Sequence, residues 1–222
     1  MSIRQPKLLN HPDRFAAGWY WAIAAKQLRR GQVKAVTVQG RDLVVYRGED
    51  GQPVAMNAYC PHMGAHLAEG RVDGTGIRCF FHNWKFAATG DCVDSPALPE
   101  PAPACIQRWP TAEHYGLIWV WTGTTAQTPA PFVPELEGQD CVAAIAPPFI
   151  KPCHPNVVMI NAIDAHHFNT VHNLPLDVKF AVERRSDAAI AFHNTTRGGD
   201  ESWFVRLIRP FYRKAVTYSM CY

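Results

Sequence analysis

The sequence predicts an all-β domain, an antiparallel sandwich, followed by a region that contains both helix and strand. Between residues 18 and 124, short apolar segments with a period of two alternate with turn signals, a pattern typical of such a sandwich. Residues 125–155 are rich in proline and are expected to connect the two parts. Residues 156–222 begin with a helix-capable run and continue with strand-like segments, and residues 1–17 are expected to form a polar leader.

The first strands of the sandwich are predicted to form a hairpin. The aromatic run at 18–23 is expected to pack at the start of the domain. From residue 33 to residue 37 apolar and polar side chains alternate, a polar tip follows at 39–42, and an apolar run covers 43–46. Alternation interrupted by a polar tip is the pattern of a β-hairpin.

Two further predicted strands carry cysteines at or near their ends. A strand over 54–59 delivers Cys60 at its end, and a strand over 77–81 carries Cys79. The second of these strands is expected to pair with two apolar segments that follow later in the domain, 104–109 and 115–121. Both cysteines are therefore expected at loop tips of the sandwich, where functional side chains commonly lie.

The second region is expected to open with one helix. Prolines exclude helix before residue 156, and the run 156–172 is helix-capable until 173–175 ends it. Strand-like segments follow at 188–192 and 202–208, joined by 197–200, and a last strand opens at residue 215. Because a sheet that stops inside a strand leaves an unpaired edge, we interpret this polypeptide as the front part of a longer one.

Composition excludes several classes of function and compartment. A net charge of +3 without a long basic run argues against nucleic acid or an anionic membrane as a partner. The sequence contains no apolar run long enough to cross a bilayer, and its N-terminus does not resemble a signal peptide. The expected compartment is the cytoplasm. Five of the seven cysteines fit this expectation, because they show no paired framework and are expected to be reduced: Cys92, Cys105, Cys141, Cys153 and Cys221.

Four metal-binding residues form the most informative pattern in the chain. Cys60-Pro-His62 is followed, after 16 intervening residues, by Cys79-Phe-Phe-His82, so each half offers one thiolate and one imidazole. A [2Fe–2S] cluster with two Cys on one iron and two His on the other requires this ligand set. Two Cys and two His also satisfy a structural zinc site, although zinc fingers usually group like ligands together.

The residues that flank these ligands resemble a Rieske iron–sulfur domain. The patterns C-P-H-x-G-x-x-L and C-x-x-H-x-W-x-F are both present, from Cys60 to Leu67 and from Cys79 to Phe86. One departure is Asn83, where the family most often has glycine. A turn accepts asparagine in a left-handed conformation, so this departure does not weaken the resemblance. Trp84 is expected to pack beneath the cluster.

A second motif lies in the predicted helix. Asn161, Asp164, His167 and His172 match N-x-x-D-x-x-H-x-x-x-x-H, which resembles the mononuclear iron motif of Rieske non-haem iron oxygenases, in their large or terminal oxygenase component. A histidine-rich helix by itself is more often ordinary surface than a metal site. The interpretation as an iron site therefore depends on the Rieske pattern that precedes it. The adjacent His166 is rotated about 100° around the helix and is expected to pack rather than to bind metal.

The resemblance implies a ligand set and an electron path. His167 and His172 become two ligands of a 2-His-1-carboxylate Fe(II) site with positions open for O₂. Asp164 becomes the link between a ligand His of the iron and His82 of a neighbouring subunit. In the family the catalytic domain is α+β, so the predicted fold is an all-β Rieske domain followed by the first part of an α+β catalytic domain, and homotrimers are common.

The implied function is that of an oxygenase component, with two alternatives left open. A reductase or ferredoxin would reduce the [2Fe–2S] cluster, and the Fe(II) would activate O₂ to hydroxylate an apolar, aromatic or steroid-like substrate. The Pro-His-Met-Gly run and the tryptophan-rich segment 117–121 favour the branch that includes ketosteroid hydroxylases. A Rieske-type electron carrier and a structural zinc module are the alternatives. The pattern leaves open the substrate, the site of its oxidation and the choice among monooxygenation, dioxygenation and demethylation.

The family's third iron ligand, a downstream Asp or Glu, has no recognisable counterpart in the sequence. The acidic residues after His172 are few, and none stands in a comparable context: Asp177, Glu183, Asp187, Asp200 and Glu201. This gap favours the alternative of an electron carrier, or of a fragment without a working mononuclear iron.

Overall fold

The structure, a computed structural model, describes residues 17–131, 152–172, 176–177, 179–186, 189–198 and 216–221. These residues belong to two compact units, one within 15–147 and one within 148–222, and each unit is described by itself. In the described ranges no helix has the length and apolar character needed to cross a membrane.

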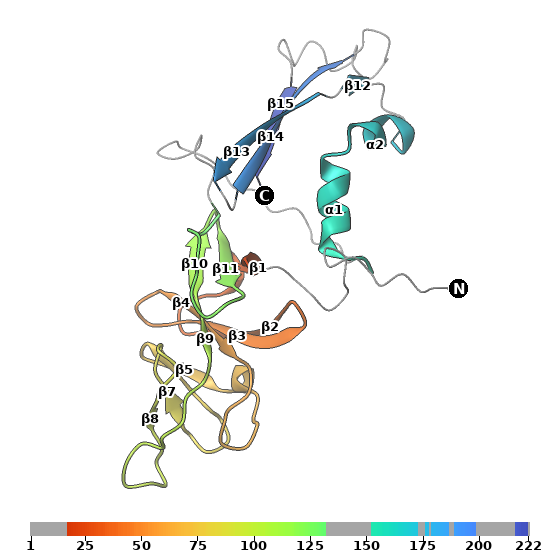
Figure 1. Cartoon of the computed structure of the whole chain (residues 1–222). Coiled ribbons are helices and arrows are strands. Elements are labelled where there is room, and N and C mark those ends of the chain that lie inside the picture. Colours follow the sequence, from red (N-terminus) through yellow and green to blue (C-terminus); the bar gives the residue numbers. More distant parts are fainter. Residues whose placement is uncertain are drawn as a thin grey trace, which may run out of the picture. The chain divides into compact units, whose positions relative to one another are not determined.

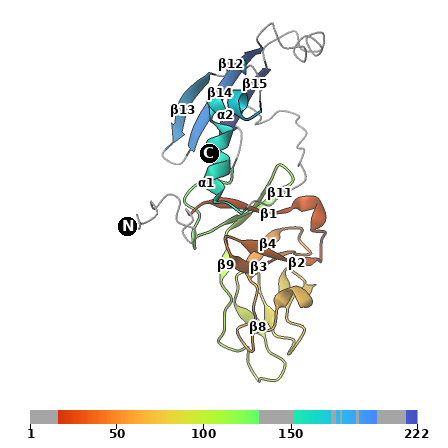
Figure 2. The same cartoon turned by 90° about the vertical axis from the view of Figure 1, so that its right-hand side faces the viewer.

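The first unit consists of three antiparallel sheets. The middle sheet has the order β2-β3-β4-β9, from Val33–Val38, Arg41–Arg47, Pro53–Asn57 and Arg108–Trp109. A second sheet has the order β1-β11-β10, from Trp19–Ala24, Leu117–Trp121 and Thr111–His114. The third has the order β5-β6-β7-β8, from Arg71–Asp73, Gly76–Arg78, Lys85–Phe86 and Cys92–Asp94. Short 3-10 helices η2 (Ala25–Gln27) and η3 (Leu67–Glu69) complete the unit, and the middle sheet lies between the other two (Figures 1 and 2).

Strand β3 is buried on both faces because it runs through the centre of this stack. Its residues Leu43 and Val45 pack into one apolar cluster, and Val44 and Tyr46 pack into another. The cluster of Leu43 and Val45 also contains Ile118 and Val120 of β11. The cluster of Val44 and Tyr46 also contains residues of the third sheet and its loops. A continuous apolar run is the expected sequence signature of a strand with two buried faces.

The predicted hairpin is confirmed, whereas the predicted partners of the strand at 77–81 are wrong. Strands β2 and β3 pair from Val33–Tyr46 to Val38–Arg41. Strand β6 ends at Arg78 and pairs with β5 and β7, while β9 pairs with β4, and β11 pairs with β1 and β10. The tight turn between β5 and β6, with Gly74 at φ 65°, explains the difference, because pairing across a short loop has a small entropic cost. The strand predicted over 54–59 ends earlier, at Asn57.

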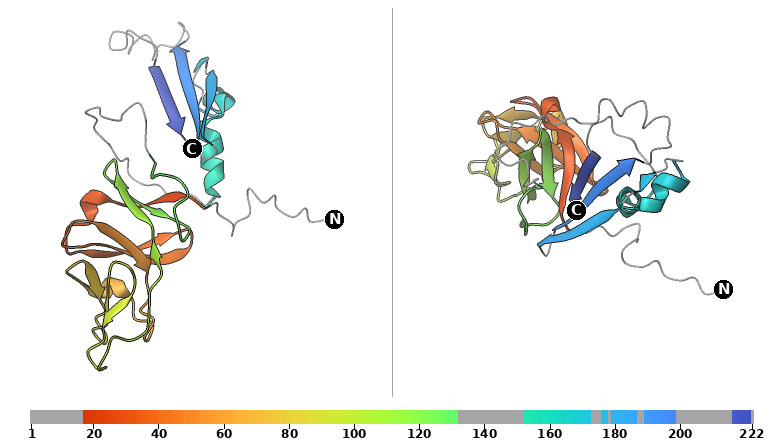
Figure 3. Two further views of the ribbon diagram at one scale, coloured as in Figure 1. Left: turned by 60° about the vertical axis from the view of Figure 1, so that its left-hand side comes forward. Right: turned by 90° about the horizontal axis from the view of Figure 1, so that it is seen from above.

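The second unit contains two helices and a small antiparallel sheet. The helices are α1 (Pro155–Ala162) and α2 (Ala165–Thr170). In the sheet β14 (Ala189–Gly198) pairs with β12 (Leu176–Asp177), β13 (Phe180–Ser186) and β15 (Val216–Cys221). Figure 3 shows the helices beside this sheet, and α2 contacts β12.

The single helix predicted over 156–172 is wrong, because the helix is broken at Ile163 and Asp164. The Asp164 carboxylate caps the second helix, so the chain begins a new helix there instead of continuing the first. Helix α1 starts one residue earlier than predicted, at Pro155, since proline is well accepted at the first helical position.

Two of the three strands predicted in this region are present in the structure. The strand predicted at 188–192 is β14, which is longer and continues to Gly198, into the expected joining segment 197–200. The strand predicted from residue 215 is β15, and β13 was not predicted. The predicted strand 202–208 lies outside the described residues.

The packing of the first unit leads to a stability prediction. Leu67 is 0% exposed, and replacement by alanine should lower the free energy of unfolding by about 2–5 kcal/mol because it leaves a cavity beneath a ligand loop. Urea unfolding followed by tryptophan fluorescence measures this change, since six of the seven tryptophans lie in the first unit.

The matched control is Leu98→Ala. Leu98 is 47% exposed, so this variant should stay within about 0.5 kcal/mol of the parent. Equal losses in the two leucine variants would contradict the assignment of Leu67 to the core.

Candidate metal centres

The first candidate ligand loop follows β4 and turns back on itself. The Cys60 N–H donates to the Ala65 carbonyl at 2.9 Å, and the Gly64 N–H donates to the Cys60 carbonyl at 2.9 Å. Gly64 has φ 73°, a left-handed conformation that glycine adopts without strain. His66 accepts the Ala68 N–H on Nδ1 at 3.1 Å and thereby caps η3, which gives this histidine a structural role.

The second candidate ligand loop is the hairpin loop between β6 and β7. It is closed by the Cys79 N–H, which donates to the Trp84 carbonyl at 2.9 Å. Asn83 has φ 57°, the left-handed conformation that a turn accepts for asparagine. Arg78 donates from Nη1 to the Asn83 carbonyl at 2.6 Å and ties the loop to the sheet.

The two loops bring all four predicted cluster ligands to one end of the unit. Cys60 is 3% exposed and Cys79 is 1% exposed, and both belong to the apolar cluster between the middle and third sheets. Their thiols are close enough to influence each other. His62 and His82 are exposed, and their ring centroids are 4.5 Å apart. Each loop thus places its sulfur inside the fold and its imidazole outside.

Aromatic side chains flank both imidazoles. The His62 ring is stacked on Trp84, with the ring centroids 4.3 Å apart and an interplanar angle of 4°. The His82 ring lies 4.0 Å from the Phe81 centroid. Stacking restricts rotation of an imidazole, so both rings are partly oriented before any metal binds.

The buried Cys60 thiol needs a positive charge beside it in order to ionise. The pKa of Cys60 is raised to about 11, chiefly by burial. The neighbouring Cys79 acts in the same direction, and the backbone amides of His62 and Met63 act against it. Two buried sulfurs and two adjacent imidazoles fit a Rieske cluster, because its ferric irons supply that charge and a thiolate is the form that binds metal. Without metal, the folded chain holds this proton more tightly than the unfolded chain does. The stability of the metal-free fold should therefore decrease as pH rises from about 9 to about 11.

The second motif is only partly assembled. Asp164 accepts the backbone N–H of His166 at 2.9 Å and that of His167 at 3.3 Å, both on Oδ1. The His167 and His172 ring centroids are 4.9 Å apart, so the two predicted iron ligands are neighbours although His172 follows the end of α2. That Asp164 links a ligand histidine of the iron to His82 of a neighbouring subunit stays a prediction.

Among the described residues, no three His, Cys, Asp or Glu side chains form a group suited to a single metal ion. The Rieske site does not require one, because each of its two irons takes only two protein ligands. Glu183 is one of the acidic candidates for the third ligand of a mononuclear iron. Its carboxylate contacts His193 at 3.0 Å and Arg185 at 3.5 Å, so it is engaged by these two side chains. Only the backbone of Asp177 is described, and the other acidic candidates, Asp187, Asp200 and Glu201, lie outside the described residues.

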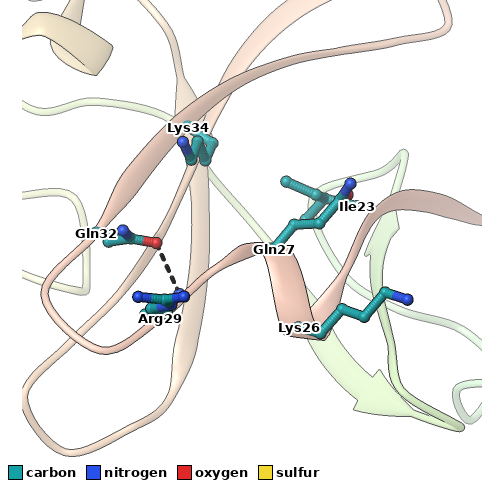
Figure 4. Close-up of a pocket in the computed structure, with 6 residues that line it drawn as sticks. All are labelled: Ile23, Lys26, Gln27, Arg29, Gln32 and Lys34. Atoms are coloured by element: carbon teal, nitrogen blue, oxygen red, sulfur yellow. Dashed lines mark hydrogen bonds between the residues drawn. The ribbon is translucent and has the colours of Figure 1, made fainter.

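A surface pocket of about 630 Å³ lies elsewhere in the first unit (Figure 4). Its lining is mostly cationic and polar and comes from β1, η2 and the chain up to β2: Ile23, Lys26, Gln27, Arg29, Gln32 and Lys34. The Arg29 N–H donates to the Gln32 side chain at 3.0 Å across it. None of the candidate ligands is among the residues that line this pocket.

Comparison with known proteins agrees with this arrangement. Residues 18–112 match the Rieske [2Fe-2S] domain family. The chain is 35% identical over 170 residues to cholesterol 7-desaturase of Bombyx mori, which covers 74% of this chain and 37% of that protein. It is 37% identical over 127 residues to the oxygenase component of 3-ketosteroid-9-alpha-monooxygenase of Rhodococcus rhodochrous, covering 56% of this chain and 33% of that protein. The chain spans less than half the length of these relatives.

A solved structure shows the same fold. Dicamba monooxygenase bound to dicamba aligns with a TM-score of 0.64 and 22% identity, covering 96% of this chain and 64% of that one. The fold, the two ligand loops and the family match define a protein with a Rieske [2Fe–2S] domain. More particularly, the chain is similar in sequence to oxygenase components such as that of 3-ketosteroid-9-alpha-monooxygenase.

The raised pKa of Cys60 leads to a prediction for the metal-free protein. Only the thiolate reacts with iodoacetamide, so alkylation of Cys60 should still be accelerating at about pH 10, where a thiol of ordinary pKa has levelled off. Mass spectrometry of the Cys60 peptide measures the rate, with the exposed Cys105 as reference. A Cys60 rate that levels off by about pH 9 would contradict the burial of this thiol in the apolar cluster.

Proposed function

We propose that this chain acts as the oxygenase component of a multicomponent Rieske oxygenase. Cys60, His62, Cys79 and His82 would hold the [2Fe–2S] cluster, and His167 and His172 would hold a mononuclear Fe(II). The observation that carries the proposal is the pairing of two buried sulfurs with two exposed imidazoles 4.5 Å apart. Relatives named as a ketosteroid monooxygenase component and a cholesterol desaturase support the activity.

The ligand side chains would give the cluster two unequal ends. When bound, the cluster supplies one-electron transfer and the mononuclear Fe(II) supplies O₂ activation. Cys60 and Cys79 would bind as anionic thiolates inside the apolar cluster, whereas His62 and His82 would bind as neutral imidazoles at the surface. Because neutral ligands stabilise ferric iron less than thiolates do, the exposed end is the one expected to take up the electron.

The exposure of His62 and His82 suits partners that must come close to the cluster. We propose a reductase or ferredoxin as the electron donor. In a homotrimer, the Asp164 carboxylate of a neighbouring subunit would link His82 to His167. The capping bonds from His166 and His167 already hold that carboxylate at the start of α2. A bond from a ring to a fixed carboxylate orients a histidine ligand.

The proposed substrate is small and apolar, in the class of steroids or aromatic compounds, and O₂ is the co-substrate. The names of the two curated relatives support a sterol or steroid in particular. The cytoplasm is the proposed compartment, and the described cysteines agree with a reducing environment because Cys92, Cys105 and Cys153 are free.

A Rieske-type electron-transfer protein is the second candidate. One observation favours it: in the described part of the chain, no third metal-binding side chain joins His167 and His172. Two imidazoles without a carboxylate bind Fe(II) weakly compared with the three-ligand set of this iron class. In that case the cluster would serve as a relay and the second motif would not bind iron.

Metal analysis distinguishes the two candidates. The oxygenase proposal predicts about three irons per two acid-labile sulfides in anaerobically purified protein, because one mononuclear iron adds to each cluster. The double variant His167→Ala/His172→Ala should bring the ratio down to about two irons per two sulfides and leave the cluster's EPR signal after dithionite unchanged.

Three outcomes are informative. A ratio of about two in the parent chain, with a Rieske EPR signal, would identify the electron carrier and overturn the oxygenase proposal for this chain. A ratio of about three that the double variant does not lower would place the third iron elsewhere. A colourless protein that contains zinc would contradict both candidates.

A further inference from the structure

Arg78 makes an unusual set of contacts directly beneath the second ligand loop. It is the last residue of β6 and precedes Cys79, and its side chain is 14% exposed. Its Nε donates to Asp73 at 2.8 Å, and its Nη1 donates to Asp94 at 2.8 Å. The same Nη1 donates to the Asn83 carbonyl at 2.6 Å. One guanidinium therefore connects β5, β8 and the loop that carries His82.

The sheet register explains why Arg78 can make these contacts. Arg78 lies opposite Arg71 on β5 and opposite Lys85 on β7, and Lys85 lies opposite Asp94 on β8. Residues directly opposite one another on neighbouring strands point to the same face, so these charges form one row. Asp73 also binds Lys85 at 3.2 Å. Two carboxylates thus hold the planar guanidinium in one orientation.

Asn83 accepts hydrogen bonds from two arginines at the turn that follows His82. Asn83 directly follows His82 and has φ 57°, a conformation that few residues other than glycine adopt readily. Its side-chain oxygen also accepts a bond from Arg71 Nη1, at a longer distance of 3.3 Å. The Asn83 carbonyl belongs to the peptide that joins Asn83 to Trp84. Fixing it constrains the backbone directly after His82, and thereby the turn that carries the His82 side chain.

We propose that Arg78 is a positioning residue for His82. Held by Asp73 and Asp94, its guanidinium sets the orientation of the His82 ring toward the metal through the Asn83 carbonyl. The inference rests on the proposed function, because it takes His82 as a cluster ligand. A lysine at this position keeps the charge but lacks the planar fork, and so cannot bond the three acceptors in the same way.

The test is Arg78→Lys in the full chain, loaded with iron and sulfide. The variant should assemble the cluster with the parent's ratio of iron to sulfide. The principal g-values of its dithionite-reduced EPR spectrum should shift, and a chelator should remove the cluster about tenfold faster, as is common when a residue that supports a metal ligand is changed. The g-values report on ligand geometry, which a change in fold stability alone would leave in place.

Arg47→Lys is the matched control. The Arg47 side chain is also 14% exposed and binds a half-exposed carboxylate, Glu113, at 2.7 Å. It also donates to the carbonyls of Leu28 and Gly51, and all of these contacts lie away from the ligand loops. This variant should lose stability but keep the parent's g-values and rate of cluster loss.

A second variant covers the case in which Arg78→Lys does not fold. Asp94→Asn leaves Arg78 present but weakens one of the two bonds that orient it, so the g-values should shift in part. The inference is overturned if Arg78→Lys has the same g-values and the same rate of cluster loss as Arg47→Lys. The same holds for Asp94→Asn where it replaces Arg78→Lys. In either case the proposed function stands. A parent chain that binds no iron and sulfide overturns the proposed function and this inference together.

Discussion

Burial of the Cys60 and Cys79 side chains in the apolar cluster between two sheets is the contact on which the candidate cluster site depends. The two sulfurs pack with Leu67, Ile77 and Phe86 in the same cluster, so each ligand loop is anchored at its first residue. The imidazoles emerge two or three residues later, at the surface. A redox centre held in this way has one end in an apolar medium and the other end near solvent. This asymmetry suits a site that must keep its metal and still meet a partner.

The scaffold supports that arrangement with short backbone contacts. Each loop is closed by one backbone bond from the cysteine itself, to Ala65 in the first loop and to Trp84 in the second. Left-handed residues, Gly64 and Asn83, allow the sharp turns. Behind the loops, β3 is buried on both faces and fixes the middle sheet. Because backbone bonds already restrict these loops, they would lose less conformational freedom on binding a cluster, which would lower the entropic cost of binding.

How far the sequence predicts this structure depends on whether a feature is local. The hairpin of β2 and β3 follows from neighbouring residues, and it is confirmed. The partners of β6 depend on how distant segments meet, and the prediction was wrong. The break before α2 had a local signal, because Asp is a preferred helix cap, but the apolar run across it obscured the signal.

In the candidate cluster site, too, local features could be predicted from the sequence and non-local contacts could not. The ligand motifs predicted that two loops would bring Cys60, His62, Cys79 and His82 together, and the described geometry agrees with that expectation. The contacts of Arg78 could not be predicted, since they require the register of four strands. Nor could the stacking of Trp84 on His62, which depends on the final packing of both loops.

The central claim is that two histidines ligate one iron of the cluster. Electron nuclear double resonance of dithionite-reduced protein, with ¹⁵N introduced only in histidine, tests it most directly. If both histidines bind the iron, ¹⁵N couplings from two distinct nuclei are expected, and one of them should disappear in His82→Ala or in His62→Ala if the cluster persists. A reduced cluster signal without any ¹⁵N coupling would contradict the claim.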